Sequence, residues 1–348
     1  MPSKLRIWLS YVFDYAVIAI LLGVWAYLST LPPNFSRFSL DNKSLQYPIA
    51  NPETISYKTA LMLCVVVPIG VIFIWALVID MVRYKSSTFK ARLWEFNVGF
   101  LGLALSFTLS IVITTSLKGI VGRPRPDSIA RCLPRPGSQD ADVFGLSSVA
   151  ICTQTDIDVL NDGWRSWPSG HSSSAFAGLF YLSLYLAGKL SLMDNKGEVW
   201  KTAIVMFPTL GAGAIATSRI LDHRHHGTDV FTGSILGVAT AWLAYRQYYP
   251  SLVDTGRQGR AWGIRVWGET KAATHDYVPG AAADSNREDL ELGGMQDQFK
   301  PESSTANERC DETDVADRAL IAPMYTPTRE TELESIINDA DSKQRVAL

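Results

Sequence analysis

The chain has little charge and little cysteine for its 348 residues. Charged residues make up 19% of it and the formal net charge is -2, which excludes a nucleic-acid binder that acts through bulk electrostatics. The four cysteines, Cys64, Cys132, Cys152 and Cys310, show no CxxC or Cys/His spacing. We therefore expect neither a zinc site or other metal site nor a disulfide-rich fold.

Long apolar runs, by contrast, are abundant. Hydrophobic residues make up 47% of the chain, and many of the acidic residues lie after Pro250. A helix that crosses a hydrocarbon core of ~30 Å needs about 20 mostly apolar residues. Six stretches have this length: 12–29, 60–82, 96–117, 173–193, 199–217 and 230–249. The sequence thus predicts an all-α integral membrane protein in which residues 1–250 form a six-transmembrane-helix bundle, with the first helix a retained anchor and not a cleaved signal peptide.

The C-terminal stretch 251–348 has a different composition. It is rich in Asp, Glu, Ser, Thr and Gly and has few aromatic residues. Such a segment cannot bury enough apolar surface to offset the entropy that is lost on ordering. We predict a disordered cytoplasmic tail there.

Basic residues predict which way the bundle faces. The connection RYKSSTFKAR at 83–92 has four basic residues and no acidic one, and short loops rich in Lys and Arg stay cytoplasmic, so both termini are expected to be cytoplasmic. The glycosylation sequons at Asn34 and Asn42 fall on the opposite, luminal or extracellular face. Cys132 and Cys152 fall there too, and they could pair if their loop faces an oxidising lumen. The alternative is two unpaired thiols.

Three polar clusters share that outer face, in the loops 118–171 and 218–229. The first, KGIVGRPRP, begins at Lys118 and includes Arg125. Positive charge on the outer face opposes the usual bias of membrane proteins. The predicted orientation argues against the alternative of a cytosolic stop-transfer cluster, and we interpret these cations as an anion-binding site.

The second cluster, WPSGH, ends at His171 and leads into an apolar run. Gly170 lies where a helix is expected to begin, and the free N–H groups and positive dipole end of a helix can hold a phosphate oxygen. His171 would then stand beside the anion as a proton donor or acceptor. A capped turn with a surface histidine is the alternative for so short a string.

The third cluster, SRILDHRHHGTD, runs from Ser218 to Asp229. His225 and Asp229 are four residues apart and would share one face of a helix, so the carboxylate can hold one ring nitrogen while the other acts as a nucleophile. The alternatives are a hydrated interfacial cluster and a metal site of clustered histidines. Arg219 and Arg224 disfavour the metal site because they would repel a cation.

Together these motifs resemble the three-part signature of the type 2 phosphatidic acid phosphatase family, the lipid phosphate phosphatases. The matching residues are Lys118, Arg125 and Pro126, then Pro168, Ser169, Gly170 and His171, then Ser218, Arg219, His225 and Asp229. The likeness is detailed over residues 94–249. The residues around the motifs and the long acidic tail are most similar to those of fungal diacylglycerol pyrophosphate and phosphatidate phosphatases. His223 departs from the pattern, since many eukaryotic members have an aromatic residue there.

The resemblance implies a metal-independent phosphatase that hydrolyses phosphatidate, diacylglycerol pyrophosphate or lysophosphatidate without a cofactor. In this scheme His225 attacks phosphorus and forms a phosphohistidine, Asp229 orients it, and His171 protonates the leaving oxygen. The groups that would bind the phosphate are the side chains of Lys118, Arg125, Ser169 and Arg219 and the N–H of Gly170, with Arg123 and Arg224 ranked second.

Other functions fit the same scaffold. One is hydrolysis of sphingoid-base or polyprenyl phosphates, which the motif residues do not separate from the first. Another is a non-catalytic transporter or receptor, against which the intact catalytic residues argue. The expected partners are a membrane lipid phosphate and the bilayer, with no nucleic acid and with homo-oligomerisation left open. The expected location is an endomembrane (vacuole, Golgi or ER) or the plasma membrane.

Overall fold

The computed structural model describes residues 4–84, 87–254 and 259–263, and within these ranges all regular secondary structure is helical. The α-helices are α1 (Lys4–Thr30), α2 (Tyr57–Leu61), α3 (Val67–Ile74), α4 (Asp80–Arg83), α5 (Phe89–Val121), α6 (Ser128–Cys132), α7 (Ile157–Gly163), α8 (Gly170–Ala175), α9 (Tyr181–Lys189), α10 (Val199–Leu221) and α11 (Gly227–Tyr248). Three π-helical turns connect α-helices: η2 (Met62–Val66) joins α2 to α3, η3 (Trp75–Ile79) joins α3 to α4, and η5 (Phe176–Phe180) joins α8 to α9. Two 3₁₀ turns, η1 (Lys43–Leu45) and η4 (Val149–Ile151), lie in the loops. The all-α prediction is confirmed.

Four helical segments of the described chain are long and apolar enough to cross a membrane. They are Leu9–Thr30, Tyr57–Arg83, Phe89–Val121 and Val199–Leu221. Large apolar side chains remain exposed on them, among them Phe207 with 78% of its surface accessible, as expected where lipid replaces water. The predicted stretches 173–193 and 230–249 fall in α8–α9 and α11, which are not among these four.

Helix α5 is longer than the predicted stretch 96–117 at both ends. It begins inside the basic connection because the side chain of Thr88 accepts a hydrogen bond from the Ala91 N–H and caps the first turn. It ends at Gly122, which has a left-handed φ of 59°. A Cβ at Gly122 would lie 1.5 Å from the Asn34 carbonyl oxygen, so only glycine fits where the chain from α1 crosses the end of α5.

Small residues allow α11 to pack closely on the start of α8. A Cβ at Gly233 would lie 2.6 Å from the Ser169 carbonyl oxygen, and one at Gly237 would lie 2.4 Å from that of Ser173. The Ser169 N–H donates to the backbone oxygen of Asp229 at 2.9 Å. The second and third predicted clusters are therefore held together by backbone contacts.

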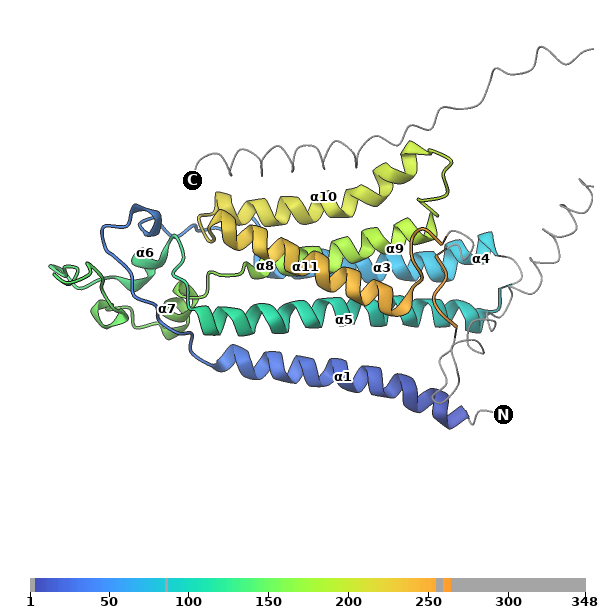
Figure 1. The fold of residues 1–348 in the computed structure, drawn as a ribbon, viewed down its shortest axis with the longest axis horizontal. Coiled ribbons are helices and arrows are strands. Elements are labelled where there is room, and N and C mark those ends of the chain that lie inside the picture. The colour runs from blue at the N-terminus through green and yellow to red at the C-terminus, as the bar shows by residue number, and fades with distance from the viewer. Residues whose placement is uncertain (1–3, 85–86, 255–258, 264–348) are drawn as a thin grey trace, which may run out of the picture. The chain divides into compact units, whose positions relative to one another are not determined.

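All three predicted clusters lie at one end of the helices. Figure 1 shows α6, α7 and the loops around them at that end, and α4 and the first residues of α1 at the opposite end. The structure joins Cys132 and Cys152 in a disulfide within these loops. Asn34 and Asn42 lie in the connection from α1 to α2, and both are exposed.

The predicted boundary at residue 250 is followed by a short segment that contacts the helices. The Ala261 N–H donates to Glu95 Oε1 at 3.0 Å, and the Trp262 N–H donates to the Tyr248 carbonyl at 3.0 Å. The predicted disordered tail otherwise lies outside the described residues.

Candidate active site

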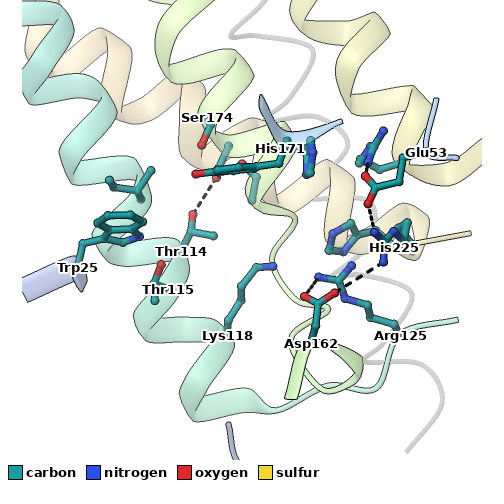
Figure 2. A pocket seen from close by; sticks show the side chains of 16 residues that line it. Trp25, Glu53, Thr114, Thr115, Lys118, Arg125, Asp162, His171, Ser174 and His225 are labelled. Carbon is teal, nitrogen blue, oxygen red and sulfur yellow. Dashed lines mark hydrogen bonds and ion pairs between the residues drawn. The ribbon is translucent and has the colours of Figure 1, made fainter. Parts of the chain in front are cut away.

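The three clusters line a single cavity of about 330 Å³. The signature residues that line it are Lys118, Arg125, Gly170, His171, Arg219 and His225. Figure 2 shows Lys118, His171 and His225 approaching this cavity from different helices and loops. Crossings of the helices bring together side chains that are more than a hundred residues apart in the sequence.

Ser169, predicted as a phosphate ligand, is buried at the start of α8 and is not among the side chains that line the cavity. Its Oγ accepts hydrogen bonds from the N–H and the hydroxyl of Ser172. The hydroxyl therefore acts as the N-cap of the helix. This leaves Gly170, the first residue of α8, facing the cavity.

His225 is buried and precedes α11. The helix begins at Gly227 with His226 as its N-cap, so the helical i, i+4 geometry predicted for His225 and Asp229 does not apply. His225 Nδ1 lies 3.9 Å from Asp229 Oδ2, which is too long for a hydrogen bond. In the described part of the chain this nitrogen has no hydrogen-bond partner.

The charge state of His225 suits a nucleophile. Burial and the neighbouring Arg125 lower the pKa of His225 well below its ordinary value, against the opposing effect of Asp229. The imidazole is therefore neutral near pH 7. A neutral ring has a free lone pair, and only that form can attack phosphorus.

Asp229 is buried and heavily engaged. It accepts hydrogen bonds from Arg123 Nη1 at 2.6 Å, from Ser166 Oγ at 2.6 Å and from the His226 N–H at 3.1 Å. His226 Nδ1 is 3.3 Å from Asp229 Oδ2 and thus closer to the carboxylate than His225. Arg123, ranked second as a phosphate ligand, is bound to Asp229 and does not line the cavity.

His171 is the second histidine of the cavity. It precedes the apolar stretch 173–193, and the ring of Tyr57 stands edge-on to it with centroids 5.7 Å apart. Its Nε2 is buried and has no hydrogen-bond partner among the described residues. Burial, Arg219 and Lys118 lower the pKa of His171 to about 3.

Two carboxylates that the sequence did not single out share the cavity with the cations. Arg125 Nη2 donates to Asp162 at 2.6 Å, and Arg219 Nη1 donates to Glu53 at 2.9 Å. Lys118 Nζ donates to the Arg165 carbonyl at 2.8 Å. The lining cations are Lys118, Arg125, Arg219 and Arg224 and the lining anions are Glu53 and Asp162, so the formal charge has an excess of two positive units. That excess of positive charge suits an anionic phosphate ester.

No sequence signal could have revealed these two carboxylates. Glu53 lies in the connection from α1 to α2 and Asp162 lies in α7, and neither belongs to a motif or to a periodic apolar pattern. Their role depends on a fold that brings distant loops together.

Fold and site together define a helical protein with membrane-capable helices and a cationic cavity that presents two histidines. The sequence profile of the PAP2 superfamily matches residues 99–252. The chain is 36% identical over 241 residues to "Probable diacylglycerol pyrophosphate phosphatase 1" of Schizosaccharomyces pombe, which covers 69% of this chain and 81% of the relative. It is 32% identical over 272 residues to "Lipid phosphate phosphatase 2" of Arabidopsis thaliana, which covers 77% of this chain and 86% of the relative.

A third relative is "Diacylglycerol pyrophosphate phosphatase 1" of Saccharomyces cerevisiae, 32% identical over 239 residues, with 68% of this chain and 78% of the relative covered. No solved structure matches the chain significantly. The chain belongs to the PAP2 superfamily, and the resemblance inferred from its three motifs is confirmed.

Proposed function

We propose that the chain is a metal-independent lipid phosphate phosphatase acting on phosphatidate, diacylglycerol pyrophosphate or lysophosphatidate. The observation that carries this proposal is the cavity, in which an excess of positive charge surrounds two histidines, and in which the buried Nε2 of His171 has no partner among the described residues. Unpaired buried polar atoms are costly, and a phosphate oxygen could satisfy this nitrogen. The names of the relatives support the lipid substrate class.

In the proposed reaction His225 attacks phosphorus and the bond to the leaving oxygen breaks. His171 gives a proton to that oxygen and afterwards takes one from the attacking water, which releases phosphate from His225. Asp229 stabilises the positive charge that forms on the His225 ring. Its hydrogen bonds to Arg123 and Ser166 fix its position.

Positive side chains and one helix terminus would neutralise the charge on the transferred phosphoryl group. We assign this role to Lys118, Arg125, Arg219 and the Gly170 N–H, which all line the cavity. Ser169 contributes by capping α8, because its cap fixes the turn that presents Gly170. Trp25 of α1 and Ile111 of α5 add apolar surface to the same cavity, as suits a substrate whose acyl chains stay in the bilayer.

Activity is expected to persist in excess EDTA, because protein cations take the place of a divalent ion at the phosphate. The purified protein in detergent micelles should release phosphate from phosphatidate and diacylglycerol pyrophosphate at rates that change by less than about twofold with chelator. Orthovanadate, which adopts a five-coordinate geometry like the transition state, should inhibit. Complete loss of activity on chelation, with recovery on addition of Mg²⁺, would contradict the mechanism.

We also propose a six-span topology with the cavity on the luminal or extracellular side. The stretches 173–193, in α8–α9, and 230–249, in α11, would be the two further spans, lined with small residues because they pack against protein more than lipid. The basic connection 83–92 would be cytoplasmic. Both termini would then be cytoplasmic, and an endomembrane or the plasma membrane would hold the protein.

Thiol labelling in sealed vesicles of known orientation tests this sidedness. With an impermeant reagent, Cys132 and Cys152 should react only from the non-cytoplasmic side and only after reduction, because the structure pairs them in a disulfide. A Cys132→Ser/Cys152→Ser variant is the control for labelling elsewhere. Labelling of the pair from the cytoplasmic side would invert the topology.

A further inference from the structure

Glu53 occupies the cationic side of the cavity. Its Oε2 accepts a hydrogen bond from Arg219 Nη1 at 2.9 Å, and its Oε1 accepts one from Arg224 Nη2. All three side chains line the cavity. Figure 2 shows Glu53 near His225. One carboxylate thus joins Arg219, in the last turn of α10, to Arg224, which directly precedes His225 in the loop.

The contacts of Arg219 show what a phosphate would have to replace. Its Nε donates to Ser218 Oγ at 3.1 Å, and its Nη2 donates to the Ile55 carbonyl at 2.7 Å and lies 2.9 Å from Asp222. Ser218, Ile55 and Asp222 do not line the cavity. Nη1 is therefore the nitrogen directed at a cavity group, and that group is Glu53.

The backbone next to Glu53 is fixed independently of its side chain. The Thr54 N–H and hydroxyl donate to the Asp222 carboxylate at 3.0 and 2.5 Å. The side chain of Glu53 keeps 25% of its surface accessible, whereas that of Arg219 keeps 1%. Rotation of the Glu53 side chain toward solvent thus needs no movement of the segment that holds it, while Arg219 stays in place.

Electrostatics gives this carboxylate two opposite effects. It compensates two arginines, one of them fully buried. Without it Arg219 would keep Asp222. Arg224 would keep only the more distant carboxylates of Asp127 and Asp162, at 3.9 and 3.7 Å, and an incompletely compensated buried charge is costly. When a phosphate anion enters, the same carboxylate is a like charge at the same guanidinium groups and opposes binding. Stability without phosphate and affinity for phosphate therefore favour different states of Glu53.

We propose that Glu53 is a built-in competing anion, which holds Arg219 and Arg224 when no phosphate is bound and is displaced from Arg219 by the phosphate of the substrate. This inference rests on the proposed function only in taking phosphate as the ligand of the cavity. It assigns to the connection from α1 to α2 a role in setting phosphate affinity, outside all three signature motifs.

Glu53→Gln tests the proposal, because glutamine keeps the size and one acceptor oxygen but removes the charge. Inorganic phosphate is the probe, measured as a competitive inhibitor of lipid hydrolysis and as a ligand that raises the thermal unfolding temperature of the intact protein. The variant should bind phosphate about tenfold more tightly, which corresponds to about 1.4 kcal/mol. Asp142→Asn removes the same charge from an exposed loop position and should leave phosphate affinity within about twofold.

Three results would overturn the proposal. Unchanged or weaker phosphate binding in Glu53→Gln would show that the carboxylate only positions the arginines. Equal tightening in Asp142→Asn would show a general charge effect. If the glutamine variant is not recovered folded, Glu53→Ala must show the same tightening, and its absence there would count against the proposal. The thermal measurement needs no turnover, so a chain that hydrolyses no lipid would refute the proposed function and still test Glu53.

Discussion

His225→Ala is expected to abolish lipid phosphate hydrolysis, with a loss in kcat of about 10⁴-fold or more, as for other nucleophiles that act together with a general acid. Alanine removes the only group in the proposed scheme that forms a bond to phosphorus. Rapid quenching of the wild-type protein with labelled substrate should trap a phosphoenzyme, and the variant should trap none. The variant should remain folded with some loss of stability, because truncation of the buried ring removes packing contacts.

The two neighbouring histidines provide the controls. His223 is exposed, stacks on Tyr47 with centroids 4.2 Å apart and does not line the cavity, so His223→Ala should keep both turnover and trapped label. His226→Ala should lower stability by about 1 kcal/mol through the lost cap of α11. Label that survives in His225→Ala and disappears in His226→Ala would move the nucleophile to His226, which lies closer to Asp229.

The helices and the grouping of the three motifs could be predicted because they depend on local patterns. Apolar runs of about 20 residues identify membrane-length helices, and clusters at the same end of successive helices must share a face. Lys118, His171 and His225 accordingly line one cavity. This grouping could be predicted from the positions of the motifs along the chain, without knowledge of which side chains are in contact.

Local competition between hydrogen bonds was harder to predict. The four-residue spacing of His225 and Asp229 indicated a helical pair, but His226 caps α11 and pairs with Asp229 in a capping box, which leaves His225 outside the helix. Ser169 has a similar choice, since its hydroxyl caps α8 in the structure, whereas the motif predicts that it binds phosphate. Such choices depend on where a helix starts, and helix starts are uncertain in a sequence by a residue or two.

Charge compensation was the least predictable feature. Four lining cations at one site require counterions, but the sequence does not say which acidic residues supply them. Glu53 is 166 positions from Arg219 in the sequence, and Asp162 is 37 positions from Arg125. Only the packing of the loops at this end of the helices brings each pair together.

His171→Ala is expected to lower hydrolysis of phosphatidate by about 10²- to 10⁴-fold, the range for loss of a general acid. The diacylglycerol alkoxide is a poor leaving group and needs a proton as the bond to phosphorus breaks. A lipid phosphate ester with an acidic phenol as leaving group needs no such proton. On that ester the variant should form phosphoenzyme at a rate close to wild type and then accumulate it, because His171 is also proposed to activate the water.

The pH profile distinguishes proton transfer from simple phosphate binding. The pKa of His171 is about 3, so the ring is neutral at pH 7 and the proton must arrive with the substrate, whose phosphate has its second pKa at about 6. For wild type, kcat/KM on phosphatidate should fall as pH rises above that value, because the monoanion disappears. The variant on the phenol ester should lack this fall. Equal losses on both substrates with an unchanged pH profile would instead make His171 a phosphate ligand.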